Sequence, residues 1–203
     1  MNFSRRHKKW LCRLTLLFLA IGLPIHADAH LVTTGLGPLY DGMGHMMLSP
    51  EQWIMVAGLG LLAGMGGPAT GRFVLFLFPC AWLLGGCAGH FIQLTLPSFV
   101  PAVALLIVGG LVAADLKADR NIAVTIAVVL GFLQGYLNGA SLGTADGATL
   151  ALLGASVVAF VLVTLGAGLV VNVGGWRRIV VRVAGSWMAA TGILLVGWTI
   201  RKS

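Results

Sequence analysis

The sequence predicts an all-α integral membrane protein, a six-transmembrane-helix bundle that follows a cleaved N-terminal signal peptide. Three observations lead to this prediction. Hydrophobic residues make up 58% of the 203-residue chain and charged residues only 9%, a composition outside the usual range of soluble domains. Six apolar stretches approach the roughly 20 residues that a helix needs to cross a bilayer. Residues 1–29 have the pattern of a secretory signal.

The N-terminal segment differs from the six apolar stretches. Residues 5–13 are rich in arginine and lysine, residues 14–25 are apolar, and the tripeptide Ala-Asp-Ala precedes His30. The apolar run is too short to span a bilayer, and the two alanines are the small residues that a signal peptidase recognises. We therefore expect residues 1–29 to be removed and residues 30–203 to form a single transmembrane domain. An uncleaved N-terminal anchor is the alternative.

The apolar stretches leave little chain for anything else. Their short connections allow one compact helical bundle, with no ATPase module and no nucleic-acid surface. Because cytoplasmic loops of membrane proteins are rich in basic residues, the net charge of +7 indicates topology and a lipid bilayer rather than a nucleic-acid partner. The expected spans are residues 53–71, 73–96, 99–116, 122–140, 148–173 and 183–200.

The charges also predict the direction of each helix. A cleaved signal leaves residue 30 outside, so the first span runs inward and the following spans alternate. Basic residues should then lie mainly inside. The sequence agrees, with six basic residues inside and two outside: Arg72, Lys117, Arg120, Arg177, Arg178 and Arg182, against Arg201 and Lys202.

Local patterns predict where helices begin and how closely they pack. The segment Ser49-Pro50-Glu51-Gln52 is typical of a helix start, with Ser49 as the N-cap and Gln52 completing a capping box. Glycines that recur every four residues, such as those at positions 131, 135 and 139 of the fourth span, predict close approach of helix backbones.

The few polar side chains of the apolar stretches gather at the predicted outer side. His90 lies near the outer end of the second span, Asn138 near that of the fourth, and Gln134 one helical turn deeper on the same face. Histidines and carboxylates near hydrocarbon are costly and usually serve an ion, a proton path or a partner. Their convergence on one side therefore predicts a binding site.

Four outer side chains have the chemistry of metal ligands, because imidazole nitrogens and a carboxylate suit divalent nickel, cobalt, zinc or copper. The α-amine of a mature N-terminal histidine adds a further donor. We predict that His30, Asp41 and His45 form the site that captures the ion. His90 is then the next metal-binding residue along the path, and Gln134 and Asn138 are its polar lining.

Each of these side chains also has a simpler interpretation. Asp41 could cap a short helix, His45 could be an interfacial residue, His30 could be an untethered terminus, and His90 could be hydrogen-bonded between helices.

Two further sequence patterns are weaker evidence for a function. Cys80 and Cys87 share a helix face and could mark a path of soft ligands, although buried cysteines more often serve as small apolar residues. Residues 139–143 match G-x-S-x-G, but a nucleophile elbow needs a preceding strand, and no histidine follows His90 to act as a base. We therefore expect no enzyme.

These residues together resemble the HupE/UreJ family of hydrogenase and urease accessory membrane proteins. The resemblance rests on the leader before a histidine, on the run H-x-x-x-x-G-x-G-P-x-Y-D-G-x-x-H from His30 to His45, on six short spans and on the glycine-rich fourth span. Better-known members place the Asp and His side by side and carry His, His and an acid on the later helix. Here three residues separate Asp41 from His45, and the later helix has Gln134, Asn138 and Ser141, as in a divergent branch.

The resemblance implies a nickel or cobalt permease of the bacterial inner membrane, with a periplasmic mature N-terminus and an outer His/Asp site that captures the divalent ion. No ATP-binding motif occurs in the sequence, so we expect the membrane potential to supply the energy and no organic cofactor to be needed. The alternative is a non-transporting membrane metal chaperone or accessory subunit, with copper as another cargo and metalloenzyme maturation proteins as partners.

Overall fold

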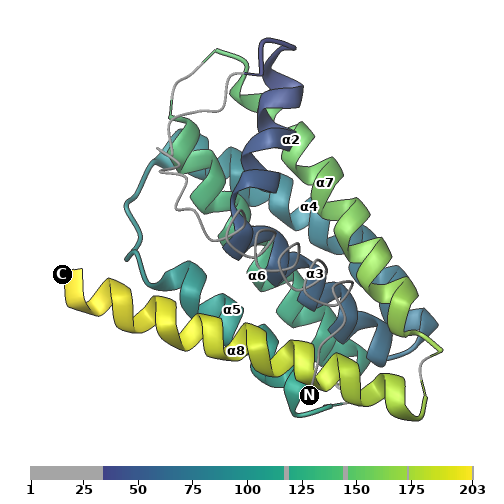
Figure 1. Ribbon diagram of the computed structural model, residues 1–203. Helices are drawn as coiled ribbons and strands as arrows, with labels where there is room; N and C mark the ends of the chain where they lie inside the picture. The colour runs from purple at the N-terminus through teal and green to yellow at the C-terminus, as the bar shows by residue number, and fades with distance from the viewer. Residues whose placement is uncertain (1–33, 117–118, 144–145, 173, 203) are drawn as a thin grey trace, which may run out of the picture. The chain divides into compact units, whose positions relative to one another are not determined.

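The computed structural model describes residues 34–116, 119–143, 146–172 and 174–202. Within these ranges the regular secondary structure is entirely helical, as predicted (Figure 1). The expected signal peptide and His30 lie outside the described residues. The helices are α2 (Pro38–Leu48), α3 (Pro50–Met65), α4 (Pro68–Ile92), α5 (Val100–Ala113), α6 (Arg120–Leu142), α7 (Ala148–Val170) and α8 (Trp176–Lys202).

Four of the described helices, α4, α6, α7 and α8, are each long and apolar enough to cross a membrane. Helices α2 and α3 pass the same test only as a pair, and α5 is apolar but has 14 residues. The structure thus supports a multi-pass membrane protein with four spans, or five if the pair counts as one. The six-span count stays a prediction, because α5 would have to cross with a rise of about 21 Å at 1.5 Å per residue.

The segment that carries Asp41 and His45 forms a helix of its own, which α3 follows at an angle of 82°. The break lies at Ser49, whose hydroxyl donates to the carbonyl of His45 at 2.9 Å and does not cap α3. Pro50 follows, and it has no N–H to continue the hydrogen bonds of α2. The capping box predicted for Ser49 and Gln52 is therefore wrong, and the pair is a broken span or a re-entrant loop.

Helices α2 and α3 run alongside α7 in the same direction. A Cβ atom on Gly147 would meet the ring of Pro38, and one on Gly64 would meet the backbone of Ala167. The pair therefore covers the length of α7, and α2 lies beside the first turns of this membrane-length helix.

The boundary between α3 and α4 is set by backbone geometry. Gly67 has φ of +92°, a conformation that favours glycine, and Pro68 occupies the first turn of α4, where its missing N–H costs nothing. The first expected span consequently ends at Met65 instead of residue 71, and the second begins at Pro68 instead of residue 73.

Helices α4 and α6 lie parallel along a seam of glycines. A Cβ atom on Gly135 would overlap the carbonyl of Trp82, and one on Gly139 would overlap the carbonyl of Gly86. The glycine spacing of the fourth predicted span thus does bring two backbones into contact, as small residues do in membrane proteins. This seam fixes the position of Asn138, which lies directly before Gly139.

Helix α5 packs antiparallel against α8 (Figure 1). Gly109 faces Ala189, and Gly185 faces Ala113, so the short helix α5 is held against the C-terminal span by close backbone contact.

This contact makes Gly109→Ala destabilising. A Cβ atom at that position would overlap the backbone of Ala189, whereas one on the neighbouring Gly110 would meet nothing within 4 Å. We expect Gly109→Ala to cost about 1–3 kcal/mol through overpacking and Gly110→Ala to be neutral or stabilising, since alanine favours helix. Thermal unfolding of the purified variants in detergent measures the difference. Equal melting temperatures for the two variants contradict the α5–α8 contact.

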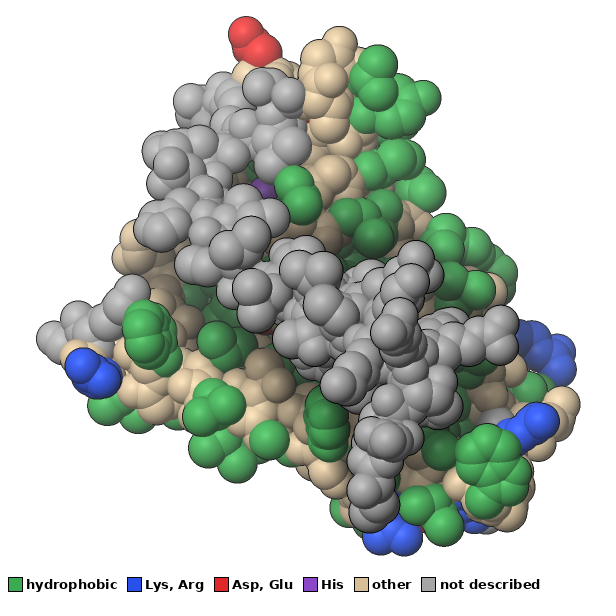
Figure 2. All heavy atoms as spheres, viewed as in Figure 1, with side chains coloured by type: hydrophobic (Ala, Val, Ile, Leu, Met, Phe, Trp, Pro, Cys, Tyr) green, Lys and Arg blue, Asp and Glu red, His purple; other side chains and the backbone are tan. Residues whose placement is uncertain are grey.

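Apolar side chains cover the outside of the described bundle. Trp187 and Leu194 of α8 are 75% and 73% exposed, and Figure 2 shows hydrophobic side chains over α7 and α8 with Lys and Arg at the margins of the face. At one end of the bundle the Arg120 guanidinium lies over the ring of Phe73, 5.3 Å from its centroid. Such a surface suits a lipid environment.

Candidate metal-binding site

A small pocket lies where α2 meets α6 and α7. Its volume is about 20 Å³, and its polar lining consists of Asp41 and His45 from α2 and Asn138 from α6. This volume is close to that of a single small occupant, because a site for one water needs roughly 10–15 Å³ by this kind of measure. The remaining wall is apolar and comes mainly from α7, through Ala151, Leu152 and Ala155.

The sequence brings Asp41 and His45 onto one face of α2 by a spacing of one helical turn. Between them lies Gly42, which is buried, and a Cβ atom there would overlap the backbone of Ala151. Since only glycine permits this approach, Gly42 holds the two ligand-type side chains against α7. On α7, a Cβ atom on Gly154 would likewise overlap the backbone of Leu39.

Asp41 is held by the segment that precedes α2. Its Oδ1 atom accepts hydrogen bonds from the Thr34 backbone N–H at 2.5 Å and from the Thr34 hydroxyl at 2.7 Å. Among the described residues none donates to Oδ2, and α2 has no side-chain cap. The carboxylate is thus oriented by one oxygen while the other is available to a ligand, and the capping role considered for Asp41 does not occur within α2.

His45 lies one turn further along the pocket and is partly buried. Its backbone carbonyl accepts the Ser49 hydroxyl, but its ring nitrogens have no hydrogen-bond partner in the part of the chain that the structure describes. An imidazole with a free nitrogen beside a free carboxylate oxygen is the donor set that a borderline divalent metal prefers.

Three amide side chains continue from the pocket into the bundle. The Asn138 amide donates from Nδ2 to Oε1 of Gln52 at 3.0 Å and to the backbone carbonyl of Gln134 at 3.3 Å. Asn138 is 3% exposed and Gln134 only 1%, and the Oε1 atom of Gln134 is buried with no partner among the described residues. Such an unsatisfied acceptor is costly, so this oxygen is available to a hydrogen-bond donor or a cation.

Gln52 was not among the predicted site residues. The pattern around Ser49 assigned it to a capping box, whereas its side chain reaches across to α6. The signal that could have revealed it is its own polarity, since it is an uncharged amide near the start of an otherwise apolar helix and needs a partner inside the membrane.

The structure does not bring His90 into this pocket. His90 lies in the last turn of α4, where its ring meets that of Phe91 edge-on at 5.1 Å, and its Nδ1 atom is buried with no partner within the described ranges. Cys80 and Cys87 are exposed on the surface of the same helix, so they do not line an interior path. Among the described residues no three His, Cys, Asp or Glu side chains gather closely enough to hold a metal.

The described ligands of the pocket are therefore an incomplete shell of one carboxylate and one imidazole, with the Asn138 amide beside them. The predicted third ligand, His30, lies outside the described residues.

The comparisons with known proteins agree with the resemblance seen in the sequence. The model of the HupE / UreJ protein family matches residues 17–195, which include α2 to α7 and most of α8. Nothing matches the chain among curated proteins or among solved structures. Since the family match covers most of the chain, the protein belongs to the HupE/UreJ family.

Proposed function

We propose that this protein is an inner-membrane permease for a divalent transition metal, nickel or cobalt, and that it captures the ion in the pocket of Asp41, His45 and Asn138. Membership of the HupE/UreJ family suggests a nickel- or cobalt-related accessory or transport role. The observation that carries the finer proposal is the pocket itself, which joins a carboxylate and an imidazole of α2 to a buried amide of α6.

The surroundings of the pocket favour a cation. The two hydrogen bonds from Thr34 hold Asp41 in place, so the carboxylate needs little reorganisation to bind. The remaining wall of the pocket is apolar and comes mainly from α7, so Asp41, His45 and Asn138 are the polar side chains that an ion would meet there. In the predicted topology this end of the bundle faces the periplasm.

The amides of Gln52, Asn138 and Gln134 provide the next contacts inward. Their oxygens are weaker ligands for nickel than imidazole, and such a step from strong to weak ligands favours onward movement. The driving force is the membrane potential, which supplies about 4.6 kcal/mol per 100 mV for a doubly charged ion, twice the value for a single charge.

Uptake of Co²⁺ into proteoliposomes, read with an internal metal-quenched fluorophore, tests the proposal. We expect saturable uptake that accelerates when an inside-negative potential is imposed and that Ni²⁺ inhibits competitively. Binding of Co²⁺ to the purified protein without uptake would contradict transport.

That second outcome favours the alternative function, a membrane accessory protein that holds the metal for an enzyme. One observation supports it. Among the described residues the buried polar side chains are Thr70, Gln134, Asn138 and Ser156, so few polar groups follow the amides toward the other end of the bundle. Copper is the cargo to test in that case, because it exceeds nickel in affinity at most nitrogen and oxygen sites.

The substitution Asn138→Leu tests the role of the amides separately from that of Asp41 and His45. The substitution keeps a similar volume but removes the contact with Gln52 and leaves its Oε1 unpaired. We expect Co²⁺ uptake to fall about 10-fold or more, as for supporting groups around a metal site, while the protein still binds the ion. Ser156→Ala is the matched control, because that buried hydroxyl bonds only to Leu153 of its own helix. Unchanged uptake in Asn138→Leu argues against a path through this amide.

A further inference from the structure

A second cavity lies at the opposite end of α7 from the Asp41–His45 pocket. It has a volume of about 160 Å³ and is lined by Met65 at the end of α3, by Val170 and Val171 at the end of α7, and by Asp115 and Arg178. Since the first pocket contacts α7 near Ala151, the two lie about 28 Å apart along this helix at 1.5 Å per residue. They therefore lie near opposite ends of a membrane-length helix.

Three helices end at this cavity. α3 ends at Met65, α5 at Ala113 and α7 at Val170, where the last four carbonyls of each helix lack a partner within the helix. Groups beyond the helices satisfy some of these carbonyls, including those of Leu62, Gly64 and Ala167. These carbonyls carry the negative end of the helix dipole, which attracts cations. The carboxylate of Asp115 adds a full negative charge to the same place.

Asp115 occupies a backbone position that favours glycine. It has φ of +55°, its N–H donates to the carbonyl of Val112, and the N–H of Leu116 donates to that of Leu111, which together form a Schellman motif at the end of α5. A left-handed residue other than glycine costs about 1 kcal/mol. Asp and Asn adopt this conformation more readily than other non-glycine residues, so the helix end is compatible with a carboxylate at this position.

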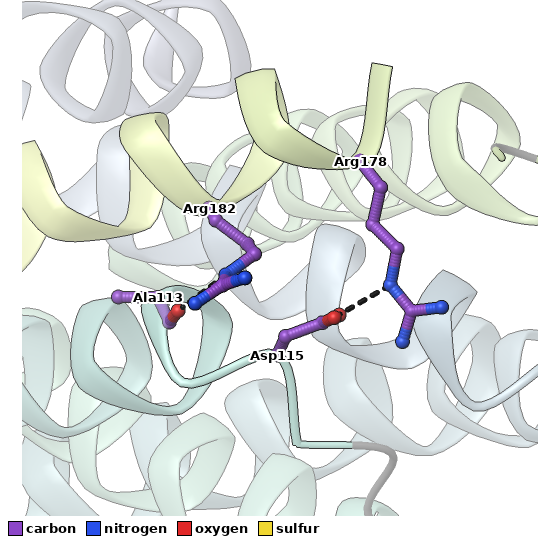
Figure 3. Close-up of polar contacts among 4 residues, drawn as sticks. All are labelled: Ala113, Asp115, Arg178 and Arg182. Atoms are coloured by element: carbon purple, nitrogen blue, oxygen red, sulfur yellow. Dashed lines mark hydrogen bonds and ion pairs between the residues drawn. The ribbon is translucent and has the colours of Figure 1, made fainter. Parts of the chain in front are cut away.

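The carboxylate is only half satisfied. Its Oδ2 atom accepts one hydrogen bond from Nε of Arg178 at 2.6 Å, while Oδ1 is buried with no partner in the part of the chain that the structure describes. Arg178 extends from the first turns of α8, and Arg182, one turn further on, donates from Nε to the carbonyl of Ala113 at 3.2 Å (Figure 3).

The contact between Arg178 and Asp115 is easily exchanged. Arg178 binds through a single Nε bond rather than the two-pronged geometry that makes such pairs strong, and its side chain is 41% exposed. The guanidinium can therefore turn into water and leave the carboxylate and the helix ends to another cation.

We propose that this cavity is a second cation site, in which Asp115 and the C-terminal carbonyls of α3 and α7 bind a divalent metal when Arg178 turns away. Its volume of about 160 Å³ accommodates an ion with several waters, at roughly 10–15 Å³ per water by this kind of measure. Oxygen donors alone bind nickel or cobalt weakly, so the site suits release rather than capture. Its role as the exit of the permease rests on the proposed function, whereas its ability to bind a cation does not.

Co²⁺ binding to the full chain in lipid nanodiscs, measured by titration calorimetry, tests the site. The parent is Asp41→Asn/His45→Ala, which lacks the first pocket's ligands. Adding Arg178→Gln is expected to raise the Co²⁺ affinity at least about 10-fold, because a neighbouring positive charge is removed. Further addition of Asp115→Gly, which suits the left-handed backbone, should abolish the gain. Arg177→Gln is the matched control, since Arg177 lines a different, apolar hollow beside Trp176.

Two results overturn the proposal: no gain of affinity with Arg178→Gln, or a gain that survives Asp115→Gly. If Arg178→Gln does not fold, Asp115→Gly alone decides, because it should remove the weak Co²⁺ binding that remains in the parent. Failure of the proposed capture pocket is a separate result, in which the parent binds Co²⁺ as tightly as the wild type. In that case the Arg178→Gln and Asp115→Gly variants still test whether the second site exists.

Discussion

Joint replacement of Asp41 by asparagine and of His45 by alanine is expected to abolish saturable uptake of Ni²⁺ and Co²⁺ and to weaken binding more than about 100-fold. Substitution of groups that merely support a metal ligand costs 10- to 100-fold, and this variant removes the carboxylate and the imidazole themselves. Both side chains line the same small pocket. Equilibrium dialysis and proteoliposome uptake measure the two effects.

The double variant should keep its fold. The asparagine that replaces Asp41 retains an oxygen that can accept from Thr34, as the carboxylate does, and the His45 ring makes no hydrogen bond within the described residues. We expect a melting temperature close to that of the wild type, so that any loss of uptake reports on the site. Asp146→Asn, which alters an exposed acid in the connection between α6 and α7, controls for the removal of surface charge.

His90→Ala discriminates between the structure and the sequence-based path. The sequence predicts His90 as the next station, whereas the structure places its ring against Phe91 and outside the pocket. From the structure, we expect uptake by His90→Ala to stay within about threefold of the wild type. Loss of a metal ligand would lower uptake much further. A loss as large as that of His45→Ala would restore the predicted relay and require a different arrangement of α4.

The helices could be predicted from composition because membrane-length apolar runs have few alternatives. The packing of α2 against α7 could not be predicted in this way. Its 11 residues are too few to span, and it contains Asp41 and His45, so the sequence assigns it to the outside. What places it beside α7 is the contact of Gly42 with Ala151, which joins residues more than a hundred positions apart and leaves no local trace.

The sequence predicts the types of side chain at the candidate site but not all of their positions. Asp41, His45 and Asn138 do meet, because the topology places the start of the first predicted span and the end of the fourth at the same level. Counting residues gives His90 a similar depth but cannot give the direction of a side chain around its helix. The seam that joins Gly85 and Gly89 to α6 sets that direction, and the neighbouring residue, His90, points elsewhere.

Gly135→Ala is the second substitution with a large expected effect. A Cβ atom at this position would overlap the carbonyl oxygen and carbon of Trp82, which are backbone atoms and cannot move as a flexible side chain does. Helices α4 and α6 must therefore separate. We expect a loss of about 3 kcal/mol or more, at the upper end of the range for overpacked sites, seen as a lower melting temperature in detergent.

The control for this substitution is Gly168→Ala on α7, where a Cβ atom would meet nothing within 4 Å. Alanine favours helix over glycine, so Gly168→Ala should melt at or above the wild-type temperature. If Gly135→Ala does the same, helices α4 and α6 do not pack through this seam.

The seam also links stability to metal capture. Asn138 lies between Gly135 and Gly139, and both glycines contact the backbone of α4, so a shift of α6 carries Asn138 away from Gln52 and from the pocket. Gly135→Ala should therefore weaken Co²⁺ binding at temperatures well below its melting point, whereas Gly109→Ala, which disturbs only the α5–α8 contact, should lower the melting temperature and leave binding unchanged. Because both variants are destabilised, a difference between them in binding is a property of the α4–α6 seam, and equal losses would place the metal site elsewhere in the bundle.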